Sequence, residues 1–137
     1  MAYYRNYTSK EDILTEYLDE LFEKYLEEME QISGINAYQF ASKFFAYFRE
    51  QKIFLKNINK AGLSGMILDR FDKYLQSIVE KVLSVQTQEK IDPYQIHFWA
   101  GGLYKVLIAW IENDFRKNDD ELAHIVRNFS APMKTAD

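Results

Sequence analysis

The stretch DPYQIHFWAGGLYKVLIAWIENDF, residues 92–115, is the most apolar part of the chain and decides its fold class. Asp92 followed by Pro93 is a typical helix start, because aspartate caps free backbone N–H groups and proline suits the first helical position. At about 3.6 residues per turn, one line of side chains is predicted to face the core. That line consists of Ile96, Leu103, Leu107 and Trp110. Both neighbouring flanks are apolar as well, so we expect this helix to be covered on most of its sides.

The two flanks of this helix differ in composition. One carries Trp99, Gly102, Val106 and Ala109, and the other carries His97, Tyr104, Ile108, Ile111 and Phe115. Gly101 and Gly102 are unusual in a helix interior, where each glycine costs about 1 kcal/mol relative to alanine. Close approach of another helix or of a ligand would compensate for that cost. A packing detail within the monomer is the alternative, and the sequence leaves both open.

The rest of the chain also follows helical periodicity, and no segment predicts a strand. Helices are expected over about residues 9–33, 36–50, 51–60, 64–85, 92–115 and 118–130. Asn36 with Gln39, and Asn118 with Glu121, are spaced as capping boxes that open two of these helices. We therefore predict an all-α fold of about six helices in one domain, residues 9–130. Residues 131–137 are expected to form a flexible tail.

Composition and charge exclude several classes of protein. The net charge is −4, and acidic residues crowd the first predicted helix, so this surface should repel the phosphates of DNA. The chain has no cysteine, which excludes disulfides and thiolate metal sites. No signal peptide is found, and no apolar stretch approaches the roughly 20 residues that cross a membrane. We expect a cytoplasmic protein with no membrane segment.

The sequence offers no recognisable catalytic or metal-binding pattern. His97 and His124, its two histidines, lie on different predicted helices and have no carboxylate at a known ligand spacing. No nucleophile elbow or phosphate-binding glycine loop is present. We therefore predict no enzyme, no metal and no cofactor. For His97 we favour a hydrogen bond to a neighbouring carbonyl, and the alternative is a polar contact to a ligand in an aromatic cavity.

The beginning of the chain, YYRNYTSKEDIL at residues 3–14, resembles a segment of TetR-family transcriptional regulators. In that family an aromatic-Tyr-x-His-Phe-x-x-Lys-x-x-Leu-Leu pattern joins the DNA-recognition helix to the ligand domain. The resemblance implies that Tyr4 and Lys10 contact DNA phosphates in an intact protein. Asn6 and Tyr7 depart from the family's histidine and phenylalanine. Residues 1–8 would then be a remnant of the recognition helix, so operator DNA is expected as a partner only of an intact, longer protein.

A second resemblance lies near the other end of the chain. FWAGGLY at residues 98–104, WIEN at 110–113 and DDELA at 119–123 look like a C-terminal domain found in TetR-type regulators. In that family the last two helices pair with those of a second subunit. The resemblance therefore implies a homodimer. We expect its interface to include Gly102, Tyr104, Ile108, Ile111, Phe115, Ile125 and Phe129, although which flank faces the partner is open.

The family's ligand domain is all-helical, and its effector pocket would lie among the Phe-rich middle helices here. The resemblance implies ligand contacts from Phe44, Phe48, Phe71, Tyr74 and His97 to an unidentified small apolar or aromatic effector. The chain is thus expected to be the effector-sensing and dimerising part of a bacterial TetR-like regulator, a repressor. The alternative is a stand-alone helical dimerisation or interaction protein that binds no ligand. A cavity inside the monomer would favour the sensor, and a solid core would favour the alternative.

Overall fold

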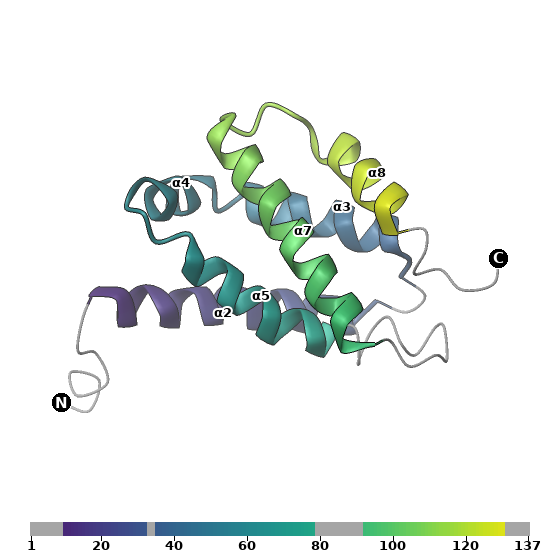
Figure 1. Cartoon of the computed structure of the whole chain (residues 1–137), viewed down its shortest axis with the longest axis horizontal. Helices are drawn as coiled ribbons and strands as arrows, with labels where there is room; N and C mark the ends of the chain where they lie inside the picture. The colour runs from purple at the N-terminus through teal and green to yellow at the C-terminus, as the bar shows by residue number, and fades with distance from the viewer. Residues whose placement is uncertain (1–9, 33–34, 79–91, 131–137) are drawn as a thin grey trace.

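The computed structural model describes residues 10–32, 35–78 and 92–130, and these residues form six α-helices with no strand among them (Figure 1). The helices are α2 (Lys10–Glu30), α3 (Ala37–Arg49), α4 (Lys52–Lys60), α5 (Gly65–Ile78), α7 (Pro93–Glu112) and α8 (Asp119–Ser130). The predicted all-α fold class is therefore confirmed.

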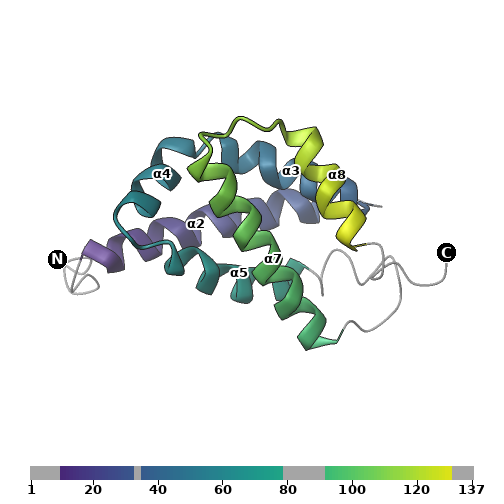
Figure 2. The same ribbon diagram turned by 45° about the horizontal axis from the view of Figure 1, so that its top comes forward.

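Each helix packs mainly on one or two others. Helix α2 packs on α5 and α3, whereas α8 packs on α3. Helix α7 runs diagonally across the molecule, where it packs on α5 and α4 (Figures 1 and 2). The two last helices are thus supported by different neighbours, α7 by α4 and α5, and α8 by α3.

Aromatic rings from α2, α3 and α5 fill the centre of the core. Helix α3 contributes Phe40, Phe44, Phe45 and Phe48, none of them more than 1% exposed. Tyr25 of α2 is fully buried, and its hydroxyl donates to the backbone carbonyl of Phe40 at 3.0 Å. The predicted core line of α7, from Ile96 to Trp110, is also buried.

Three capping boxes begin helices at the expected places. The Asn36 side chain accepts from the Gln39 N–H at 2.8 Å, while the Gln39 side chain accepts from the Asn36 N–H at 3.0 Å. Asp92 and Gln95 make the same reciprocal pair before α7. Asn118 accepts from the Glu121 N–H at 2.8 Å before α8. Each cap satisfies donors that the first helical turn leaves free.

Several predictions concern residues outside the described part of the chain. Tyr4 and the tail 131–137 are among them, as is the predicted end of the fourth helix within residues 79–91. Lys10 is described, and it lies exposed at the start of α2. Its proposed contact with DNA stays a prediction.

Candidate functional site

Helix α7 leaves one face uncovered, on which exposed apolar residues alternate with the charged Lys105 and Glu112. Tyr94 and Phe98 are 83% and 85% exposed, and Gly102 and Ala109 are exposed on the following turns. Val106 between them is half-buried. Large apolar side chains that gather on one exposed face are typical of a protein–protein interface. This flank is therefore the strongest candidate for a binding surface on α7.

The two glycines of α7 have open space above them, as far as the described residues show. Apart from the adjacent residues and the backbone of its own helix, a Cβ atom added at Gly101 or at Gly102 would meet no atom of the described residues within 4 Å. Packing within the described part of the monomer therefore does not explain why glycine occupies either position. An approach from outside the monomer remains as an explanation for Gly102, which lies on the uncovered flank.

Helix α8 also has exposed apolar side chains. Leu122, Ala123 and Val126 are buried, whereas Ile125 and Phe129 are 38% and 82% exposed. Between α7 and α8 lies a groove of about 490 Å³. Its lining comes from both helices and their connection: Val106, Ala109, Trp110, Asn113, Arg116, Lys117, Glu121, Leu122 and Ile125. We call the surface formed by Phe98, Gly102, Ala109, Ile125 and Phe129 the α7–α8 face.

Part of the flank that we predicted to face a second subunit is buried in the core. Ile111 and Phe115 are each 4% exposed, and the Phe115 ring packs on Trp110 with 4.6 Å between centroids. Tyr104 lies against Phe71, and Ile108 is half-buried against the core. The physical reason is that α7 crosses α4 and α5 on this side. Ile111 and Phe115 are therefore corrected to core positions, and the open flank is that of Gly102, Val106 and Ala109.

Three of the predicted ligand-binding residues meet in the core, and they pack closely. The Phe44 ring lies 4.7 Å from Phe48 and 5.6 Å from Phe71, centroid to centroid. All three side chains are at most 1% exposed. Because they fill the space between them, their role as ligand contacts stays a prediction.

Of the other two predicted ligand contacts, Tyr74 borders this cluster through Phe22, which packs on Phe48 and Phe71, and His97 lies outside it. Tyr74 stacks on Phe22 at 5.4 Å, and its hydroxyl donates to Asp19 at 3.0 Å and to Glu23 at 3.1 Å. His97 has a side chain that is 61% exposed, with its Nδ1 atom 3.3 Å from the Asp72 carboxylate. His97 therefore does not join the ring cluster, and its partner is a carboxylate rather than the carbonyl that we expected.

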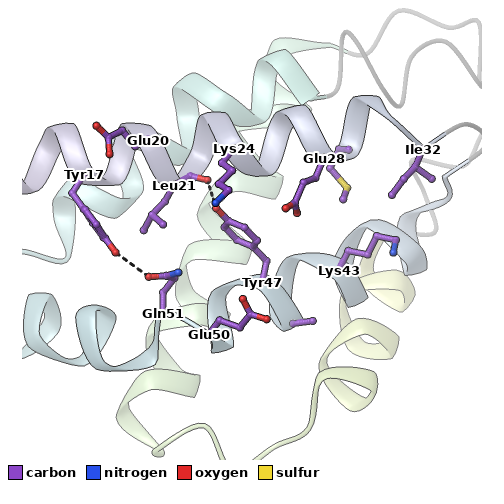
Figure 3. Close-up of a pocket in the computed structure, with 12 residues that line it drawn as sticks. Tyr17, Glu20, Leu21, Lys24, Glu28, Ile32, Lys43, Tyr47, Glu50 and Gln51 are labelled. Carbon is purple, nitrogen blue, oxygen red and sulfur yellow. Dashed lines mark hydrogen bonds between the residues drawn. The ribbon is translucent and has the colours of Figure 1, made fainter.

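An open groove between α2 and α3 was not predicted (Figure 3). It has a volume of about 550 Å³ and an apolar floor that includes Leu21 and Met29. Tyr47 lies in its middle and donates to the Leu21 carbonyl at 2.8 Å, and Tyr17 donates to Gln51 at 3.2 Å at one end. The remaining lining is mostly charged: Glu20, Lys24, Glu28, Lys43 and Glu50, with Ile32 and Ala46. In sequence these charges look like a solvated helix face, which is why the groove was missed.

Tyr47, in this groove, makes the stability of the folded chain depend on pH in the alkaline range. Burial, followed by the negative charge of Glu28, raises the pKa of Tyr47 to about 12. An unfolded chain releases the same proton at a pH of about 10. The folded state thus holds this proton longer, so stability present below about pH 10 is lost as the pH rises towards about 12.

We therefore expect the urea midpoint of the wild type to fall between about pH 9 and about pH 12, and by less in a Tyr47→Phe variant. Tyr25 and Tyr74, whose pKa values are also raised, are present in both proteins and cancel in this comparison. Urea unfolding followed by circular dichroism measures the two slopes. An equal fall in both proteins would contradict the role of Tyr47.

No group of three or more histidine, cysteine or acidic residues in the described ranges is arranged to hold a metal ion. Among the described helices, none is both long and apolar enough to cross a membrane.

Comparison with known proteins identifies one family that the chain matches. Residues 35–131 match the model of a family described as the transcriptional regulator C-terminal region, of the TetR type. The match begins just before α3 and includes α4, α5, α7 and α8. No curated protein matches the chain, and no solved structure matches it.

Proposed function

Because this chain belongs to the family of TetR-type transcriptional regulator C-terminal regions, we propose that it is an effector-sensing and dimerising domain of such a regulator. The family consists of transcription regulators rather than enzymes. The observation that carries the proposal is the uncovered α7–α8 face. A regulator of this kind acts by a change in how two subunits are placed, so a dimer surface is its central requirement.

The partner that fits the α7–α8 face is a second copy of the chain. Phe98 and Phe129 are more than 80% exposed, and both would lose contact with water in an interface. Gly102 has open space above it, which allows a helix of the second copy to approach closely. In a twofold dimer the same face meets itself, so its apolar character is complementary by symmetry. We therefore propose a homodimer through α7 and α8.

A charge placed in this face is expected to separate the subunits. In an Ile125→Glu variant each subunit would bury a carboxylate in the apolar interface, and two such charges would lie in one dimer. We expect a monomer for this variant and a dimer for the wild type, measured by sedimentation velocity at matched concentrations. Ile53→Glu is the control, because Ile53 is 72% exposed on α4 and is not part of the α7–α8 face.

The dimer proposal fails if the wild type is monomeric, or if Ile125→Glu remains as dimeric as Ile53→Glu. Gly102→Leu provides a second test of the same surface, since a branched side chain there would keep two helices apart. Its expected result is a weaker dimer with a nearly unchanged monomer, because the added side chain meets open space in its own subunit.

Effector binding is supported less directly, and one observation favours the alternative function. The closely packed rings of Phe44, Phe48 and Phe71 leave no room for a ligand unless they separate. A solid core is what a stand-alone dimerisation protein would have. The groove between α2 and α3, at about 550 Å³, has a volume in the range of small-molecule sites.

A further inference from the structure

The connection between α7 and α8 has an unusual backbone. Two hydrogen bonds close the end of helix α7. The Asp114 N–H donates to the Ile111 carbonyl at 3.1 Å, and the Phe115 N–H donates to the Trp110 carbonyl at 2.8 Å. This pattern normally places a glycine in the left-handed region. Here two residues with side chains occupy that region in succession, Asp114 with φ of 58° and Phe115 with φ of 57°. Because a Cβ atom disfavours this conformation, other contacts must hold the turn.

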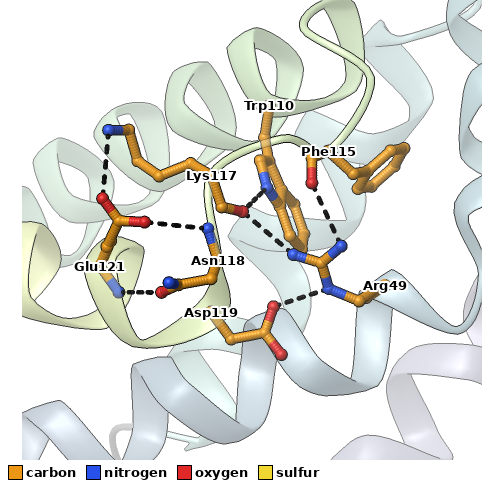
Figure 4. Close-up of polar contacts among 7 residues, drawn as sticks. All are labelled: Arg49, Trp110, Phe115, Lys117, Asn118, Asp119 and Glu121. Atoms are coloured by element: carbon orange, nitrogen blue, oxygen red, sulfur yellow. Dashed lines mark hydrogen bonds and ion pairs between the residues drawn. The ribbon is translucent and has the colours of Figure 1, made fainter.

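Arg49, in the last turn of α3, supplies three of those contacts (Figure 4). Its Nη1 donates to the Phe115 carbonyl at 3.1 Å, and its Nη2 donates to the Lys117 carbonyl at 3.0 Å. Its Nε donates to the carboxylate of Asp119 at 2.8 Å. The guanidinium also lies over the Trp110 ring, 4.8 Å from the centroid. One side chain thus contacts the end of α7, the turn and the first residue of α8.

This arrangement depends on the shape of arginine. A guanidinium directs several N–H groups outward in one plane, so it can reach two carbonyls and a carboxylate together, whereas a lysine ammonium is a single point charge. Trp110 completes the arrangement, since its indole N–H donates to the same Lys117 carbonyl at 2.8 Å. Arg49 and Asp119 are only 35% and 29% exposed, so their contact is partly shielded from water.

The position of this contact gives it a wider consequence. Helix α7 packs mainly on α4 and α5, and α8 packs mainly on α3. The two helices of the α7–α8 face therefore have different supports, and the turn between them determines how they lie relative to each other. We infer that Arg49 is a positioning residue for this face: it fixes the angle between α7 and α8 in which the face can pair with a second copy. The effect of Arg49 on pairing rests on the proposed dimer, whereas its contacts with the turn do not.

The test compares Arg49→Ala with a core variant that lowers stability elsewhere. We expect Arg49→Ala to raise the dimer dissociation constant by about tenfold or more, measured by sedimentation equilibrium. We also expect faster hydrogen exchange at the amides of residues 113–121. Leu18→Ala is the matched control, because Leu18 is fully buried on α2, which packs mainly on α5 and α3 rather than on α7 or α8. It should lower the urea midpoint at least as much and leave both other measurements unchanged.

Arg49→Lys keeps the charge but not the fork of donors, so an intermediate dissociation constant is expected, and this variant serves if Arg49→Ala does not fold. A wild-type dissociation constant in Arg49→Ala would overturn the inference, and so would an equal change in Leu18→Ala. If the wild type is monomeric, the proposed dimer fails separately. The exchange measurement then decides: acceleration confined to residues 113–121 supports the positioning role, and unchanged exchange overturns it.

Discussion

A Phe44→Ala variant is expected to lose about 3–5 kcal/mol in its free energy of unfolding, the range for truncation of a buried phenylalanine. The Phe44 ring is 1% exposed and contacts the rings of Phe40, Phe45, Phe48 and Phe71. Removing it leaves a void between α2, α3 and α5 that rigid neighbouring rings can fill only in part. Urea unfolding measures the loss. Ile53→Ala, at a position 72% exposed on α4, should change stability by no more than about 0.5 kcal/mol.

The size of this loss also separates the two candidate functions. A loss within the expected range means that the rings form a solid core, which an effector could enter only by separating them. A loss of about 1 kcal/mol or less would mean that the ring cluster already contains space, because truncation would then remove few contacts. That second result would support an effector pocket at Phe44, Phe48 and Phe71.

A small aromatic probe extends the same experiment. Indole is expected to raise the melting temperature of Phe44→Ala, because an apolar cavity of ring size binds apolar guests, and binding to the folded state adds to its stability. The wild type should show no such rise if its rings are closely packed. An equal rise in both proteins would contradict the solid core.

Helix starts are the part of this fold that can be predicted best from sequence. The caps at Asn36, Asp92 and Asn118 depend on side chains within three residues of the backbone groups that they satisfy. The core line of α7 is predicted for a similar reason, since periodicity along one helix defines which residues share a side. Neither prediction requires knowledge of a distant segment.

Predictions that depend on how helices cross are less successful. Ile111 and Phe115 were assigned to the outer flank of α7, because periodicity does not show which of two apolar flanks meets α4 and α5. The partner of His97 was also not predicted, because its position beside Asp72 depends on how α7 and α5 pack on each other. Arg49 had no signal in the sequence at all. Its acceptors lie 66 to 70 residues later in the chain, so a single arginine at a helix end looked ordinary.

An Asp19→Ala variant is expected to lose about 2–3 kcal/mol in its free energy of unfolding, the second-largest effect. The carboxylate of Asp19, on α2, lies 3.2 Å from the Arg70 Nε atom and 3.9 Å from the Lys73 Nζ atom. It also accepts a hydrogen bond from the Tyr74 hydroxyl at 3.0 Å. The Arg70 Nε atom is buried and has no hydrogen-bond partner within the described residues. Asp19 is therefore the charge that compensates for it, and alanine would leave a mostly buried cation without its partner.

Glu23→Ala is the matched control for this network. Glu23 also accepts from the Tyr74 hydroxyl, at 3.1 Å, but it makes no ion pair with Arg70 within the described residues. Its removal should cost about 1 kcal/mol or less, because Asp19 still accepts the same hydroxyl. Urea unfolding of both variants under one set of conditions provides the comparison. Equal losses would mean that Asp19 stabilises the fold through the Tyr74 hydroxyl and not through Arg70.

Removing the cation together with its partner should restore part of the stability. An unpaired buried charge is costly, whereas a pair replaced by apolar groups of similar size is often neutral. Asp19→Ala combined with Arg70→Met is therefore expected to be more stable than Asp19→Ala alone. Because this network joins α2 to α5, the same double variant would also change how α2 is held against α5, which in turn supports α7. A double variant no more stable than the single one would show that Arg70 does not need Asp19, and that the two helices are joined by their apolar contacts instead.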